Sequence, residues 1–167
     1  MKKILYSLFL VLFFNNILFS QSIQKDSLTD KYQSTSIIKL DSLQKDYIYN
    51  KTLQWISLNY KSAKDVIQYT DEEKNRIIIK ANFKTDLFMK EGWIGYTLTI
   101  DFKDSKLKYI FTDFNYYSAG SGKMNFESKT LGFKKKIIQE TDDNILTFEN
   151  SLKKYLLSKD DVKKEDW

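Results

Sequence analysis

Three successive segments in the middle of the chain have the residue pattern of β-strands. Apolar and polar residues alternate from Arg76 to Lys84 and from Trp93 to Lys103, and residues 107–117 are rich in aromatic side chains. Successive side chains of a strand point to opposite faces, so a period of two with one polar face predicts a sheet covered on one side only. The polar connectors 71–75 and 103–106 have hairpin length, which favours antiparallel pairing.

Two stretches outside these strands have helical spacing. In residues 45–60, large apolar side chains recur every three or four positions, and a similar stripe lies in residues 142–159. Thr141 or Asp142 is a candidate N-cap for the second helix. Both helices therefore have one apolar face to bury.

Shorter strands are predicted at residues 36–40 and 65–70. The resulting order is β-α-β-β-β-β-α. Two amphipathic helices on one face of a curved antiparallel sheet would bury both apolar stripes, so we predict a two-layer α+β domain.

Residues 1–20 have the layout of a secretory signal peptide, with cleavage expected between Ser20 and Gln21. Lys2 and Lys3 precede an apolar run over residues 4–14, which is about half the length that a membrane-spanning helix needs. We therefore expect export to the periplasm or cell envelope, or secretion, with no stable membrane anchor after cleavage.

The remaining chain reads as one domain with polar ends. Residues 21–36 are polar and are expected to form a flexible leader, residues 37–158 the domain, and residues 159–167 a charged tail. Within the domain, residues 118–136 hold three of the five glycines and are predicted to form a loop.

The composition excludes several kinds of chemistry. The chain has no His and no Cys, so it offers no zinc site of the usual ligands, no Cys nucleophile, no Ser-His-Asp triad and no disulfide. We expect no metal and no cofactor. Any catalysis would depend on carboxylate, Lys or hydroxyl groups.

Five stretches resemble a known family when taken together. They are Tyr47-Ile48-Tyr49, Trp55-Ile56, Lys64-Asp65-Val66-Ile67-Gln68-Tyr69, Tyr96-Thr97-Leu98-Thr99-Ile100 and Tyr109-Ile110-Phe111-Thr112-Asp113-Phe114. This set is similar to the bacterial domain of unknown function with a TBP-like fold (domain of unknown function 4468 type). The resemblance implies that fold and an exported protein. It brings no established activity and therefore no catalytic residues.

Nucleic acid is an unfavoured partner despite the formal charge of +5. The predicted open sheet face carries Lys80 and Lys84 but also Asp101, and Arg76 is the only arginine available for bidentate base contacts. An alternative is a small envelope hydrolase that uses carboxylate or Lys chemistry. Asp101, Asp104 and Asp113 are its candidate acids, although such acids need a desolvating cleft.

The favoured function is a non-catalytic binding module for an unknown envelope protein or ligand. Polar alternation on the strands and the aromatic content of 16% suggest that the open face and the 118–136 loop form the contact surface. We predict Thr97, Thr99, Tyr109 and Phe111 as binding residues on that face.

Overall fold

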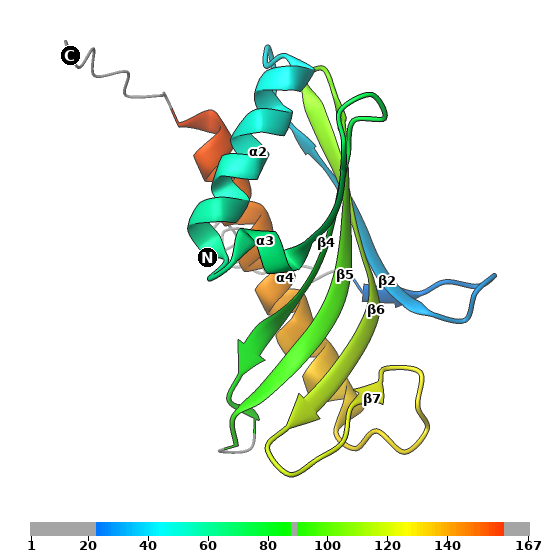
Figure 1. The fold of residues 1–167 in the computed structure, drawn as a ribbon. Coiled ribbons are helices and arrows are strands. Elements are labelled where there is room, and N and C mark those ends of the chain that lie inside the picture. The colour runs from blue at the N-terminus through cyan, green and yellow to red at the C-terminus, as the bar shows by residue number, and fades with distance from the viewer. Residues whose placement is uncertain (1–22, 88–89, 159–167) are drawn as a thin grey trace, which may run out of the picture.

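A curved antiparallel sheet forms one layer of the molecule, and two helices form the other (Figure 1). The computed structural model describes residues 23–87 and 90–158. Its strands lie in the order β1-β2-β6-β5-β4-β3, and β7 pairs with β6 off this path. The strands are β1 (Ile23–Lys25), β2 (Tyr32–Lys39), β3 (Ile67–Asp71), β4 (Arg76–Thr85), β5 (Gly92–Lys103), β6 (Lys106–Ser118) and β7 (Met124–Asn125).

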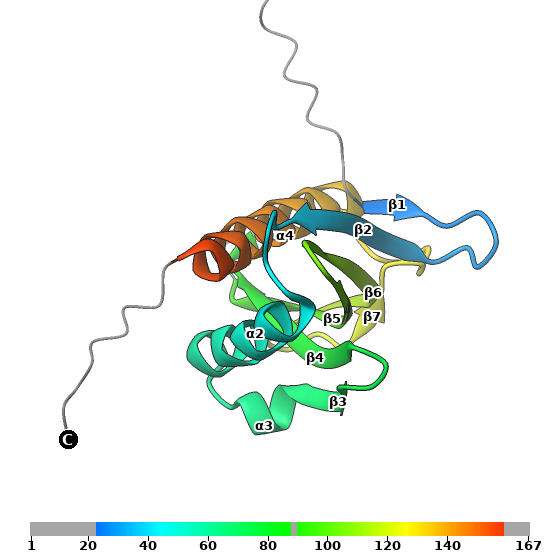
Figure 2. The same cartoon turned by 90° about the horizontal axis from the view of Figure 1, so that it is seen from above.

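Helices α2 (Lys45–Asn59) and α4 (Lys134–Leu157) both lie on one side of the sheet, and the short α3 (Ala63–Val66) leads into β3 (Figures 1 and 2). The apolar stripe of each helix packs on the inner side chains of the strands. Phe148 of α4 contacts Trp55 of α2 and Phe111 of β6, with ring centroids 5.4 and 5.1 Å apart. The core therefore lies between the helices and the sheet.

The opposite side of the sheet, here called the open face, carries the polar half of each alternating strand. In β5, Leu98 and Ile100 are fully buried towards the helices, whereas Thr97 and Thr99 between them are partly exposed. Neighbouring β4 repeats this pattern, since Ile79 is buried and the next residue is an exposed lysine. The predicted α+β class, the one-sided covering and the TBP-like architecture are thus confirmed.

The segment predicted to be a flexible leader is ordered from residue 23 onward. It contributes β1 and most of β2, which pairs with β6. Two buried residues attach this polar segment to the rest of the domain. Ile23 is buried and its N–H donates to the Asp142 carboxylate at 2.9 Å, while Ser34 is buried in β2. The hydrogen bonds of backbone pairing stabilise β1 and β2, because the few apolar side chains of this segment would not be enough to do so.

Helix α4 begins at Lys134, earlier than predicted, and its N-cap residue is Phe133. The candidate cap Thr141 lies inside the helix, where its hydroxyl donates to the Ile137 carbonyl at 2.7 Å. The helix start lacks the usual signals because no acidic residue and no capping side chain occurs there. Residues 134–136 are three consecutive lysines without an apolar residue, and the prediction therefore places this first turn in the 118–136 loop.

The predicted signal peptide with its Ser20–Gln21 cleavage site and the charged tail lie outside the described residues. Within residues 23–87 and 90–158, neither long helix is apolar enough over a sufficient length to cross a membrane.

Candidate functional site

The four predicted binding residues lie on opposite faces of the sheet. Thr97 and Thr99 are on the open face, as predicted, and are partly exposed. Tyr109 and Phe111 point towards the helices and are 1% and 0% exposed, so their prediction as surface residues is wrong. The Tyr109 hydroxyl donates to the Glu149 carboxylate of α4 at 2.5 Å. Burial, followed by this hydrogen bond, raises the pKa of the Tyr109 phenol above its ordinary range.

A β-bulge in β6 determines which of its later side chains reach the open face. Thr97 pairs with Thr112 and Gly95 pairs with Asn115, so β6 contains one more residue than β5 between these pairs. The extra length lies around Asp113, whose φ of 55° is in the left-handed region. Because one added residue reverses the alternation, Asn115 and Tyr117 lie on the open face beyond the bulge.

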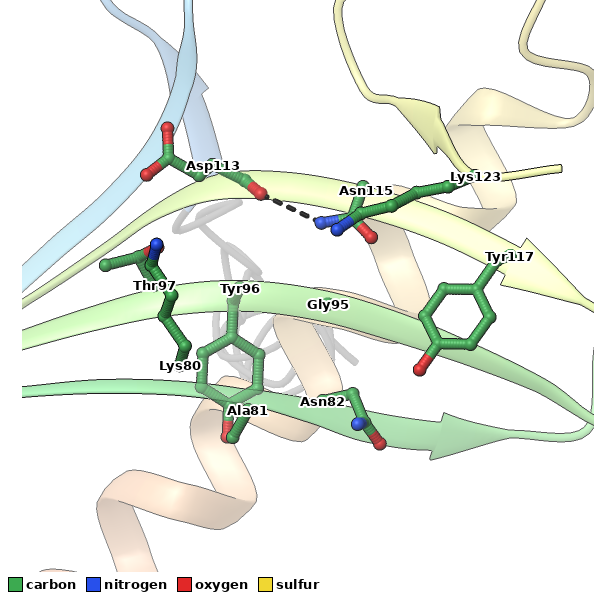
Figure 3. Close-up of a pocket in the computed structure, with 10 residues that line it drawn as sticks. All are labelled: Lys80, Ala81, Asn82, Gly95, Tyr96, Thr97, Asp113, Asn115, Tyr117 and Lys123. Atoms are coloured by element: carbon green, nitrogen blue, oxygen red, sulfur yellow. Dashed lines mark hydrogen bonds between the residues drawn. The ribbon is translucent and has the colours of Figure 1, made fainter. Parts of the chain in front are cut away.

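A depression of about 380 Å³ opens on this face beside the bulge (Figure 3). We call it the open-face pocket. Strands β4, β5 and β6 form its floor, and Lys123 enters from the loop between β6 and β7. Its volume lies within the range of about 300–1,000 Å³ that is typical of ligand sites. The lining residues are Lys80, Ala81, Asn82, Gly95, Tyr96, Thr97, Asp113, Asn115, Tyr117 and Lys123.

Asn115 is the most constrained polar side chain of the open-face pocket and is 6% exposed. Its Nδ2 donates to the Asp113 carbonyl at 3.1 Å, but no donor in the described part of the chain reaches its buried Oδ1. A buried acceptor left unsatisfied costs about 1–3 kcal/mol. This amide oxygen can therefore accept a hydrogen bond from a bound group.

Gly95 makes room for that amide. A Cβ at Gly95 would lie only 2.7 Å from Oδ1 and 2.8 Å from Nδ2 of Asn115. Neither atom could stay in place, so the glycine and the asparagine form one structural unit in the floor of the pocket.

Two lysines make the open-face pocket electropositive. Lys80 and Lys123 are exposed, and neither forms an ion pair with any residue in the two described segments. The acid in the lining, Asp113, is paired with Lys31 of the β1–β2 connection at 3.3 Å. In Figure 3 the Lys123 side chain extends in the direction of Asn115. Positive charge is thus available to an anionic group.

Tyr117 provides a flat apolar surface at one end of the open-face pocket. Its ring stacks on that of Trp93 in β5, with centroids 5.3 Å apart and an interplanar angle of 17°. Both residues are partly exposed. The stacked partner restrains the Tyr117 ring, so the fold itself holds this surface in place.

Only part of the predicted contact loop, residues 118–136, belongs to this site. Lys123 lines the pocket, and Asn125 of β7 pairs with Asn115. Farther along, Phe126 and Leu131 are buried in the core and fix the rest of the segment to the domain.

The carboxylates considered for hydrolysis each serve a separate contact. Asp101 accepts two hydrogen bonds from the Arg76 guanidinium, at 2.6 and 3.0 Å. Asp104 accepts the backbone N–H of Lys45 at 2.8 Å, and Asp113 is the partner of Lys31. In the described residues, no three His, Cys, Asp or Glu side chains are grouped so that they could hold a metal ion.

Comparisons with known proteins agree with this architecture. Residues 35–117 match the family model described as a domain of unknown function (DUF4468) with TBP-like fold. A TBP-like protein from Parabacteroides distasonis superposes with a TM-score of 0.67 at 12% identity, over 79% of this chain and 96% of that one. A DUF4468 family protein from Bacteroides ovatus gives a TM-score of 0.63 at 15% identity, over 81% and 92%. No protein with a curated description matches the chain significantly.

Proposed function

We propose that this chain, which belongs to the DUF4468 family of domains with a TBP-like fold, is an exported, non-catalytic binding module. Its ligand would bind on the open face, at the open-face pocket. The observation that carries this proposal is the buried Asn115 Oδ1, to which no group in the described residues donates a hydrogen bond. A ligand that donates a hydrogen bond there would satisfy an atom that the described fold leaves unsatisfied.

Three further features support binding over catalysis. Lys80 and Lys123 offer positive charge that no acid among residues 23–87 and 90–158 pairs with, and the Tyr117 ring offers a restrained apolar surface. The lining contains one acid, Asp113, and that carboxylate is engaged by Lys31. Polar groups that converge on a preformed concave surface are typical of ligand sites.

Paired charge-reversing variants test the proposal. In Thr97→Glu/Lys123→Glu, two acids would stand at the open-face pocket, whereas Thr147→Glu/Lys153→Glu places the same changes on the exposed side of α4. Each protein would be immobilised and exposed to an envelope extract of the bacterium that makes it, and the retained compounds identified by mass spectrometry.

We expect the unmodified chain and the α4 variant to retain the same compounds and the pocket variant to lose them, with unchanged circular dichroism in all three. Equal retention by Thr97→Glu/Lys123→Glu would refute the proposed function, because the open face would then be dispensable for binding.

A further inference from the structure

The chemistry of the open-face pocket is specific enough to name a ligand class. We propose that the pocket binds an acidic oligosaccharide, with one sugar ring carrying a carboxylate lying over β5 and β6. This inference rests on the proposed function, because it identifies the ligand of the same site. Three groups in the lining carry it: a lysine pair, an amide acceptor and an aromatic ring.

The lysine pair selects an anion. Lys80 comes from β4 and Lys123 from the β6–β7 loop, so their ammonium groups approach the pocket from different elements (Figure 3). Asp113 does not cancel them, since it is bound to Lys31. A carboxylate between the two lysines would accept charge-assisted hydrogen bonds from both.

The amide selects a hydroxyl. The Oδ1 of Asn115 can only accept, so its partner must be a donor, and a sugar hydroxyl is a donor that stands beside a ring carboxylate. Thr97 and Asn82 line the same pocket and can bind further hydroxyls. The Lys123 side chain, which extends towards Asn115, would turn to the ligand carboxylate and so open Oδ1 to the hydroxyl.

The aromatic ring selects a flat, weakly polar surface. Tyr117 presents its face beside these polar groups and is backed by Trp93. One face of a pyranose carries mainly C–H groups and packs on such a ring, while the ring edge carries the hydroxyls. The pocket lies on an open sheet face, which leaves room for neighbouring sugars on either side.

Charge distribution disfavours a nucleic acid at this site. A nucleic-acid strand presents a phosphate at every nucleotide and needs a continuous row of free cations. On the open face the Arg76 guanidinium is occupied by Asp101, and Asp113 stands in the pocket lining. The two pocket lysines, which have no ion-pair partner in the described part of the chain, match one carboxylate better than a row of phosphates.

The test measures binding of defined saccharides to the purified full chain. The probes are tetrasaccharides of galacturonate, of alginate and of hyaluronan, each with its carboxyl-methylated form, and a single-stranded oligonucleotide. Titration calorimetry would follow the full chain, Lys80→Gln, Lys123→Gln, Tyr117→Ala and the control Lys106→Gln. Lys106 begins β6, at the end of the strand remote from Tyr117, so the control removes the same charge away from the pocket.

We expect at least one acidic tetrasaccharide to bind, and its methyl ester to bind at least tenfold more weakly. Lys80→Gln and Lys123→Gln should each weaken binding about tenfold, Tyr117→Ala should weaken it similarly, and Lys106→Gln should leave it unchanged. Affinity should also fall as salt is added, because the lysines are exposed.

Several results would overturn the inference. Equal binding of an acid and its ester would remove the role of the lysine pair, and preferential binding of the oligonucleotide would replace the ligand class. Binding that is unaffected in Lys123→Gln and Tyr117→Ala would move the site elsewhere. If no saccharide binds while the extract experiment still shows retention that depends on the open face, the ligand class is wrong and the proposed function stands. If face-dependent retention is also lost, both fail.

Discussion

Replacing Asn115 by leucine should stabilise the domain and abolish ligand binding, two effects of opposite sign. Leucine has the same branching as asparagine, so its two methyl groups would take the places of the amide oxygen and nitrogen that lie over Gly95. The substitution therefore removes both polar atoms from the floor of the open-face pocket and keeps the branching of the side chain.

The magnitude follows from two hydrogen-bond terms. Removing the unsatisfied Oδ1 recovers about 1–3 kcal/mol, while losing the Nδ2 bond to the Asp113 carbonyl costs about 0.5–1.5 kcal/mol. The net gain in the free energy of unfolding is about 1 kcal/mol. For a protein of this size such a gain raises the melting temperature by about 2–4 °C.

Urea and thermal unfolding, followed by circular dichroism, would measure this gain. The matched control is Asn82→Leu, because Asn82 lines the same pocket but is exposed, so its loss should change stability by less than about 0.5 kcal/mol. A lower melting temperature for Asn115→Leu would refute the reasoning, since removal of the amide oxygen would then bring no gain in stability.

Three other outcomes follow from the described contacts. Phe133→Gly should raise the free energy of unfolding in urea by about 1 kcal/mol, because the largely exposed Phe133 has a strained φ of 53° that glycine adopts without strain. A loss of stability would show that the side-chain contacts of Phe133 outweigh the strain. Tyr109→Ala should cost about 3–5 kcal/mol and Thr97→Ala less than 1 kcal/mol, measured in the same way, and similar costs would contradict the assignment of the two residues to opposite faces. The backbone N–H of Thr29, first among several hydrogen bonds, lowers the pKa of Asp26. The ionised Asp26 carboxylate therefore stabilises the fold above the ordinary aspartate pKa, and this stabilisation is lost as pH falls through the lower pKa of the folded state. The difference in the free energy of unfolding between the unmodified chain and Asp26→Asn should shrink between about pH 7 and about pH 2. A constant difference would exclude this linkage.

Residue periodicity predicted most of the domain because burial is one-sided. The alternation in β4 and β5 gave strands whose observed bounds differ from the expected ones by a single residue at one end. Helix α2, predicted over residues 45–60, is observed at Lys45–Asn59. In each of these elements one set of side chains must face the core, and the sequence records that requirement directly.

Elements that depend on pairing or on a distant contact were missed. Strand β1 and the first part of β2 contain few apolar residues, and their order comes from pairing with each other and from the contact of Ile23 with Asp142. The first turn of α4 lacks any local start signal, yet its Ile137 is 1% exposed. The contact of Ile23 with Asp142 joins residues 119 positions apart, and periodicity describes only the local sequence.

The candidate site was half predicted for a related reason. Thr97 lies in an unbroken alternating strand, so its face followed from sequence, whereas the faces of the β6 aromatics depend on the bulge at Asp113. Before the bulge, odd-numbered residues such as Tyr109 face the core. After it, odd-numbered residues face outward.

The bulge therefore links core formation to the proposed binding surface. Without the extra residue, Asn115 and Tyr117 would point to the helices along with Tyr109, and the open face would carry Phe114 in their place. With it, Phe114 stacks on Phe126 in the core at a centroid distance of 5.2 Å, and an amide and a tyrosine ring reach the pocket. The residue that makes this exchange, Asp113, is itself in the lining and is bound to Lys31. The bulge is thus held by the Phe114–Phe126 contact on the core side and by the Lys31 ion pair on the outside, so it is a fixed feature of the strand and not a defect.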